Sequence, residues 1–363
     1  MNAKVANPFG VFVSNGEVFI ADTGNHRVRK LLRNGQIVSI AGCENGCDGD
    51  GQLATCSQLY YPMGVIVSSS NQVYISEEGN CRIRKIDQHG IISTIAGTGQ
   101  EGYNGDNQLA IHAQLYYPRG LFVTEDEEVF FCDWANHRVR KIDRHGMIST
   151  VAGNGKKGYN GDDILATDAS LNRPTSVYVQ KNEIYISDSS NQRIRKVLQN
   201  GIIKTIAGTG EHGYNGDDQP AIYSKLCFSF GVCVHNGHVY FSDGDNQRVR
   251  KILPNGIIKT IVGNGILGNN GDGHLAIESE LKYPTGIFVD DSGIYICCDY
   301  DSRIRKVDSN NGIITTIVGT GVEGYSGDVP FDFRKYPHIG PKKKQLIKPF
   351  PKSYHDIAFH FNN

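Results

Sequence analysis

Histidines recur in this chain at positions that could support metal chemistry. His26 and His137 occupy equivalent places in two copies of a repeat that runs along the chain. A catalytic metal needs several histidine or carboxylate ligands that converge on one point and leave a coordination position open. Other copies carry Cys81, Gln192, Gln247 and Ser302 at this place. We therefore interpret the two histidines as surface residues, and we leave metal binding open.

Aspartates also recur, one in each long loop of the repeat. They are Asp50, Asp106, Asp162, Asp217, Asp272 and Asp328. A calcium loop would need alternating acids and a glutamate at its twelfth position, and neither is present. An aspartate before a short helix can instead accept hydrogen bonds from its free backbone amides. We expect these residues to cap short helices.

Nine cysteines complete the set of reactive side chains. Cys43, Cys47 and Cys56 lie together in one loop, where a disulfide would need an oxidising compartment and a metal would need a fourth ligand. Cys132 and Cys297 stand where other repeats have alanine or serine, which predicts small packed residues. We expect reduced thiols.

No nucleophile elbow, phosphate loop or paired-acid motif occurs, and the G-x-G strings lack a Rossmann context.

The elements that position these side chains are repeated six times. The motif R-[VI]-R-K begins at Arg27, Arg82, Arg138, Arg193, Arg248 and Arg303, at intervals of 55 or 56 residues. Each interval contains four short runs rich in Val, Ile, Tyr and Phe, separated by Gly, Asn or Pro, which is typical of strands joined by tight turns. A strict period of this length indicates a repeat architecture. The sequence predicts an all-β, six-bladed propeller with four antiparallel strands per blade and short helical inter-blade loops.

The same pattern suggests how the chain divides. We expect a propeller domain at residues 1–337 and a basic C-terminal tail at 338–363, in which Lys342, Lys343 and Lys344 are taken as solvated linker. The expected blades span about 7–48, 62–103, 118–159, 174–214, 229–269 and 284–325. The first blade lacks the loop that precedes the others, and residues 320–337 begin that loop again. We therefore expect this closure segment to lie against blade one.

A signature between the second and third strands of each blade resembles that of the NHL-repeat family. It reads Ala-Asp-x-x-Asn-x-Arg at residues 21–27. Its structural residues are Asp22, Asn25, Arg27, Asp133, Asn136, Arg138, Asp188, Asn191, Arg193, Asp243, Asn246 and Arg248. The I-x-T-I-A-G-T-G and G-Y-N-G-D strings resemble the NHL units of teneurins and of bacterial and protist repeat proteins. We expect the first Arg of each strand to pair with the signature Asp, and Glu77 to replace that Asp in blade two.

The resemblance implies binding of proteins, RNA or glycans through one face of the propeller. It also implies a minority of enzymes, such as peptidylglycine amidating lyase, in which channel histidines hold a metal. Charge disfavours nucleic acid, because Lys and Arg total 37 against 38 Asp and Glu and the R-x-R-K strands hold 18 of the basic residues. No apolar stretch could cross a membrane, and no signal peptide precedes the first strand. We expect a cytoplasmic protein, or an extracellular one if its N-terminus is truncated.

Strand parity places the signature turn and the long loop on the same face as the loop that enters each blade, so variable side chains gather there. The candidates for binding are Arg119, Trp134, Glu78, Tyr300, His137, Phe9, Met63, Phe230 and Asp299. Phe9, Met63 and Phe230 could instead plug the ring, and Trp134 could cover a neighbouring blade. We expect a monomeric binding or scaffold protein with a protein partner and no cofactor. The alternatives are a secreted or receptor-derived recognition module and a metal-dependent lyase or hydrolase.

Overall fold

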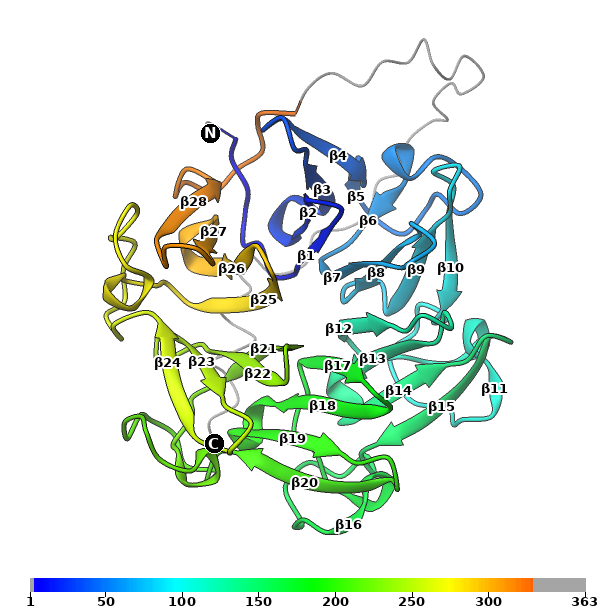
Figure 1. Ribbon diagram of the computed structural model, residues 1–363. Coiled ribbons are helices and arrows are strands. Elements are labelled where there is room, and N and C mark those ends of the chain that lie inside the picture. The colour runs from blue at the N-terminus through cyan, green and yellow to red at the C-terminus, as the bar shows by residue number, and fades with distance from the viewer. Residues whose placement is uncertain (1–2, 329–363) are drawn as a thin grey trace. The chain divides into compact units, whose positions relative to one another are not determined.

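The computed structural model describes residues 3–328, and these fold into six four-stranded antiparallel sheets arranged around a centre (Figure 1). The predicted six-bladed propeller is therefore confirmed. The first three blades contain β1 (Val11–Ser14), β2 (Glu17–Asp22), β3 (Arg27–Leu31) and β4 (Ile37–Ala41); β7 (Pro62–Val67), β8 (Val73–Glu77), β9 (Arg82–Ile86) and β10 (Ile92–Ala96); and β12 (Pro118–Val123), β13 (Val129–Asp133), β14 (Arg138–Ile142) and β15 (Met147–Ala152).

The other three blades repeat this order. They contain β17 (Ser176–Gln180), β18 (Glu183–Asp188), β19 (Arg193–Val197) and β20 (Ile202–Ala207); β21 (Ser229–His235), β22 (His238–Asp243), β23 (Arg248–Ile252) and β24 (Ile258–Val262); and β25 (Pro284–Asp290), β26 (Gly293–Cys298), β27 (Arg303–Asp308) and β28 (Ile314–Val318). Within this part of the chain no helix is long and apolar enough to cross a membrane.

Short elements decorate the loops between blades. The strands β11 (Gln108–Leu109) and β16 (Ile164–Leu165) each extend the sheet of the following blade, whereas β5 (Glu44–Asn45) and β6 (Gln58–Leu59) pair with one another. Single-turn 3₁₀ helices follow in the same loops: η2 (Ala54–Cys56), η3 (Ala110–His112), η5 (Ala166–Asp168), η7 (Ala221–Tyr223) and η8 (Ala276–Glu278). The predicted short helices are thus single turns.

Each pair of neighbouring blades shares one apolar core. The strand patterns alternate between the two faces of each sheet, so both faces carry apolar side chains that pack against the adjacent blades. The last of these six cores contains Ile20 and Ile37 of blade one together with Tyr295 and Ile304 of blade six. Blade six therefore packs on blade one as the other blades pack on their neighbours, and the ring is closed.

The innermost strands β1, β7, β12, β17, β21 and β25 surround the centre of the ring (Figure 1). Their residues line a largely apolar, partly open cavity of about 80 Å³. One residue at or just before the start of each innermost strand belongs to a set that we call the rim: Phe9, Met63, Arg119, Thr175, Phe230 and Thr285. Each rim residue is at most 9% exposed. Phe9, Met63, Thr175 and Phe230 also line the cavity, so they fill the inner end of the ring.

Candidate functional site

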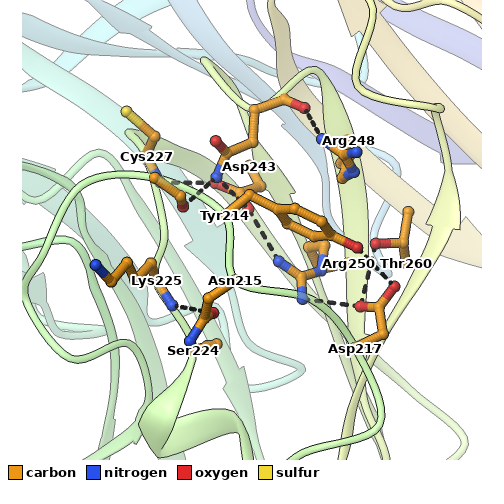
Figure 2. Close-up of polar contacts among 12 residues, drawn as sticks. Tyr214, Asn215, Asp217, Ser224, Lys225, Cys227, Asp243, Arg248, Arg250 and Thr260 are labelled. Atoms are coloured by element: carbon orange, nitrogen blue, oxygen red, sulfur yellow. Dashed lines mark hydrogen bonds and ion pairs between the residues drawn. The ribbon is translucent and has the colours of Figure 1, made fainter.

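The loop-rich face is held by a buried arginine in every blade, and blade five shows the arrangement (Figure 2). Arg250 is fully buried, and its guanidinium bonds Asp243 at 3.2 Å and Asp217 of the preceding loop at 2.8 Å. Tyr214 and Thr260 donate hydroxyl hydrogen bonds to the same Asp217. Charge-assisted bonds of this kind, shielded from water, fix a loop in position. The long loop is thereby anchored to the blade that follows it.

This network corrects the prediction that the loop aspartates cap helices. Asp50, Asp106, Asp162, Asp217, Asp272 and Asp328 all pair with the buried arginine of the next blade, at 2.5–2.9 Å. The 3₁₀ turns that follow have no side-chain capping bond. The physical reason is charge: a carboxylate gains more from a buried guanidinium than from exposed backbone amides that water can satisfy.

The expected partner of the signature acid is also corrected. The second Arg of the R-x-R-K strand, and not the first, reaches Asp22, Asp133, Asp188 and Asp243. Glu77 takes the same place in blade two and bonds Arg84 at 3.0 Å, as predicted. The first Arg points to the loop instead, where Arg248 donates to the carbonyls of Asn246 and Asn264 and stacks on Tyr214 at 3.9 Å. Side chains alternate between the two faces of a strand, and the two arginines are two residues apart, so they lie on the same face. They differ in depth, and only the second is fully buried.

The signature acids hold the segment that enters each blade. The Asp243 carboxylate accepts a hydrogen bond from the backbone N–H of Cys227 at 2.7 Å, and Asn246 donates to both Asp243 and the Gly213 carbonyl. Burial raises the pKa of Asp243 to about 6, against the opposing effect of these hydrogen bonds and of Arg250. The signature residues are therefore scaffold elements.

His137 and His26 lie at the C-terminal ends of the turns η4 (Trp134–Asn136) and η1 (Thr23–Asn25), in left-handed backbone conformations. The Nδ1 atom of His137 accepts a hydrogen bond from the backbone N–H of Arg173 at 3.1 Å, and that of His26 accepts from Tyr61 at 3.2 Å. Burial lowers the pKa of both rings to about 4, with Arg173 and Arg27 adding to the effect. Each histidine therefore acts as a neutral acceptor.

The equivalent glutamines make the same bond from blades four and five. Gln192 accepts from the backbone N–H of Phe228 and Gln247 accepts from Tyr283, both at 2.7 Å. This position joins each of these blades to the next one. Within residues 3–328 no group of three or more histidine, cysteine, aspartate or glutamate side chains is placed to hold a metal ion. All nine cysteines are free.

Arg119, Trp134 and Glu78 come together at the mouth of the channel. The Nε atom of Arg119 bonds the Glu78 carboxylate at 2.8 Å, and its guanidinium lies 4.1 Å from the Trp134 ring centre. Arg173 lies 4.6 Å from the same ring centre. Comparison of the blades in the sequence identified Arg119, Trp134 and Glu78 as candidates but did not indicate that they touch. It missed Arg173, because no repeated pattern marks this position. The result is an indole that contacts two guanidinium groups.

Trp134 belongs to a second set of positions, directly after the signature acid of each blade. We call this the rim-facing position: Thr23, Glu78, Trp134, Ser189, Gly244 and Asp299. The Thr23 hydroxyl bonds the Pro62 carbonyl at 2.6 Å, and Ser189 bonds the rim residue Thr175 at 2.5 Å. A side chain at this position therefore contacts the rim between its own blade and the next.

Blade six departs most from the shared pattern. Cys298 replaces the signature acid, and Asp299 follows at the rim-facing position in η9 (Asp299–Asp301), only 4% exposed. Tyr300 stacks on Tyr283, with ring centres 4.4 Å apart and an interplanar angle of 10°. Burial raises the pKa of Asp299 to about 7, with a hydrogen bond from Asn7 opposing the change and Glu323 adding to it.

The remaining predicted candidates lie at the rim. Phe9 and Phe230 pack edge to face with ring centres 5.8 Å apart, and Arg119 lies over the Phe9 ring at 5.8 Å. Phe230 also contacts Tyr283. Phe9, Met63 and Phe230 are buried, whereas Trp134 and Tyr300 are only partly buried. Trp134 and Tyr300 therefore offer more surface to a ligand than the three rim residues do.

Comparison with known proteins supports one family. The teneurin NHL domain model matches residues 43–103, 97–160 and 267–330, about half of the chain, and the NHL repeat model matches residues 6–31 and 171–197. NHL repeat-containing protein 2 of Gallus gallus is 24% identical over 84% of this chain and 46% of its own length. Teneurin-1 of Gallus gallus is 27% identical over 85% of this chain and 13% of its own length.

Among solved structures, virginiamycin B lyase from Staphylococcus aureus aligns with a TM-score of 0.51 and 16% identity, over 88% of this chain and 86% of that chain. At this identity the likeness shows the fold alone. The chain spans less than half the length of the two relatives from Gallus gallus.

Proposed function

The chain belongs to the NHL-repeat family, and we propose that it is a non-enzymatic recognition propeller that binds a protein partner through its loop-rich face. The ring supplies a rigid support, and the partner contacts the mouth of the channel around Trp134, Arg119 and Tyr300. Interfaces take most of their binding energy from a few Trp, Tyr and Arg side chains. This face carries all three residue types, with Trp134 and Arg119 on blade three and Tyr300 on blade six.

One observation carries the proposal: the contact of Trp134 with both Arg119 and Arg173. The indole stands at a position where the other blades have Thr, Glu, Ser, Gly or Asp. Arg119 is fixed by Glu78 and Arg173 by its backbone bond to His137. A partner that covers this indole therefore loses little side-chain entropy on the propeller side, which favours affinity.

The opposite face offers fewer such side chains. Its connections are short turns, including those at Asn15 and Gly16 and at Glu125 to Glu127. Loops held by a rigid scaffold are the usual place for binding residues. Among residues 3–328 the long loops lie at the loop-rich face. A substitution in the short turns can therefore serve as a control, because it leaves the loop-rich face intact.

The experiment compares partner capture by the full chain and two variants. Trp134→Ala removes the anchor, and Asp126→Ala changes an exposed turn residue on the opposite face. Proteins captured by the wild type and identified by mass spectrometry are then purified and titrated against all three chains. We expect Trp134→Ala to weaken binding at least tenfold and Asp126→Ala to leave it unchanged. Equal affinity in all three chains would move the site away from this face.

Arg119 needs a paired substitution in the same assay. Arg119→Ala alone leaves the Glu78 carboxylate buried at 7% exposure without its cation, and such a charge destabilises the fold. The double variant Arg119→Met with Glu78→Gln removes both charges together. Its binding can then be interpreted once its thermal unfolding matches that of the wild type.

A further inference from the structure

We propose that the loop-rich face binds one basic side chain of the partner, a guanidinium or ammonium group, at the carboxylate of Asp299 beside the Tyr283–Tyr300 stack. This inference rests on the proposed function and adds the chemistry of one contact to it. Four features of blade six and its neighbours carry it: the location of Asp299, its unsatisfied oxygen, the charges around it and the aromatic surface next to it.

The location follows from a comparison of the blades. In blades one and four the side chain at the rim-facing position donates to the carbonyl that precedes the rim residue of the next blade, as Thr23 does to Pro62 and Ser189 does to Ser229. In blade two Glu78 meets the rim residue Arg119. Blade five has Gly244 at this position, where an added Cβ would lie 2.8 Å from the Phe230 ring, so there is no room for a side chain. Asp299 occupies the same place between the rim residues Thr285 and Phe9.

One oxygen of the Asp299 carboxylate, the buried Oδ1 atom, lacks a hydrogen-bond partner among the described residues. The polar side chains at this position in blades one, two and four all have one there. A buried carboxylate oxygen without a partner costs several kcal/mol on transfer from water, on the order of 2–7 kcal/mol for a polar group. Such an atom calls for a donor from outside the fold.

The charges around Asp299 favour a cation. Burial raises the pKa of Asp299 and the nearby Glu323 carboxylate adds to the effect, whereas the neutral Asn7 side chain opposes it through a hydrogen bond to Asp299. Arg119 is the cation that acts on Asp299, and it bonds Glu78. Asp245 adds an exposed carboxylate on blade five. This part of the mouth therefore has more carboxylates than cations.

The aromatic stack gives the cation a second contact. Tyr283 is fixed through its backbone by Gln247, and Tyr300 follows Asp299 directly in the chain. A guanidinium or ammonium group near the face of an aromatic ring gains about 0.5–2 kcal/mol, more when it is desolvated. Burial raises the pKa of both tyrosine hydroxyls and Asp299 adds to the effect, so both rings lie near this carboxylate and could contact a basic side chain that binds it.

The dependence of binding on pH provides a second way to test the role of Asp299. Its pKa is raised to about 7 by burial, with Glu323 adding to the effect. A cation binds the ionised form, so a proton competes with it below that pH. Binding should therefore weaken progressively as the pH falls from 8 to about 6, whereas a contact that does not involve Asp299 would not follow this profile.

The test uses short peptides with the full chain in isothermal titration calorimetry. Acetyl-Gly-Arg-Gly-amide is the probe, a lysine peptide is the ammonium form, and the citrulline peptide is a neutral control of nearly the same shape. We expect the arginine or lysine peptide to bind wild type at least tenfold more tightly than citrulline. We expect Asp299→Asn to remove that preference, and Asp126→Asn, which makes the same charge change on the opposite face, to keep it.

Asp299→Ser is the second variant, since blade four already has serine at this position. Thermal unfolding confirms that each variant folds. Three results would overturn the inference: no binding of either basic peptide to wild type, equal binding of citrulline, or equal binding by the Asp299 variants. If the captured partner still depends on Trp134 but not on Asp299, the proposed function stands and only this inference falls.

Discussion

Asp328→Ala should destabilise the propeller more than Asp50→Ala in the first inter-blade loop, because Asp328 ties the C-terminal segment to blade one and is much less exposed. Its carboxylate bonds Arg29 at 2.5 Å and accepts from the Ser39 backbone at 3.0 Å and from the Tyr325 hydroxyl at 2.6 Å. Arg29 is fully buried, and its other acid, Asp22, lies at 3.5 Å. The substitution therefore leaves a buried guanidinium with one long ion pair.

The magnitude follows from that geometry. Removing one partner of a buried ion pair costs about 3–5 kcal/mol. Asp50→Ala is the matched control, because Asp50 bonds Arg84 at 2.7 Å, its side chain is 53% exposed, and Arg84 keeps Glu77 at 3.0 Å. A pair with this exposure contributes about 1 kcal/mol or less. We expect the free energy of unfolding to fall by about 3–5 kcal/mol for Asp328→Ala and by about 1 kcal/mol for Asp50→Ala.

Urea unfolding followed by Trp134 fluorescence measures both variants, since Trp134 is the single tryptophan. Burial acts to raise the pKa of Asp328, but the hydrogen bonds from Ser39 and Tyr325 and the Arg29 charge outweigh it and lower the pKa below its ordinary value of 3.8. The stabilisation is thus complete above pH 3.8 and is lost as the pH falls through the lowered pKa. Equal losses for Asp328→Ala and Asp50→Ala at pH 7 would refute the reasoning.

Three further predictions concern closure, histidine and thiols. Deleting residues 320–337 should lower the melting temperature of the whole ring, because it removes the contacts of Ser326 and Asp328 with blade one; an unchanged melting temperature would exclude the predicted closure. His137→Gln keeps the acceptor for Arg173, as Gln192 does in blade four, and removes a ring whose pKa is lowered to about 4. Since an unfolded histidine takes up a proton near 6.5, the wild type should lose stability relative to His137→Gln as the pH falls from about 6.5 to 4, and parallel curves would contradict this. Ellman titration should find nine thiols in urea and fewer in the folded chain, where five of the nine are buried; fewer than nine in urea would reveal a disulfide.

The sequence predicts the blades well because their signals are local. Strand patterns, glycine turns and the R-x-R-K period each lie within one repeat, so six copies reinforce one interpretation. Strand parity also placed the variable loops on one face. These inferences need only the order of residues along the chain, and tertiary packing does not oppose them.

The contacts between blades could not be predicted in the same way. Five of the six buried arginines meet loop aspartates 33 or 34 residues before them, as Arg250 meets Asp217, whereas Arg29 meets Asp328 from the other end of the chain. The first and second Arg of each strand also look alike in the sequence. Arg119 meets Glu78 of the preceding blade and Trp134 of its own. Such pairings depend on how adjacent sheets are rotated, so blade comparison identified the unusual residues without showing which of them touch.

Blade six lacks the signature acid, yet its buried arginine still has a carboxylate partner. With Cys298 in place of the signature acid, Arg305 bonds Asp272 through both Nε and Nη2, at 3.2 and 2.8 Å. In blades two to five the Nε atom of the buried arginine has no partner among the described residues. Arg305 thereby keeps two bonds to one carboxylate in the absence of the signature acid.

The carboxylate of blade six stands one residue later, at Asp299, where it does not pair with Arg305 and its Oδ1 atom has no hydrogen-bond partner within residues 3–328. A change that served stability alone would not leave a buried carboxylate at the rim, because a serine there would bond the neighbouring carbonyl as Ser189 does. The position of the acid is instead explained if a cation from outside the fold binds it. For this reason the peptide titration of the Asp299 variants is also the sharpest test of whether the face recognises a partner through charge.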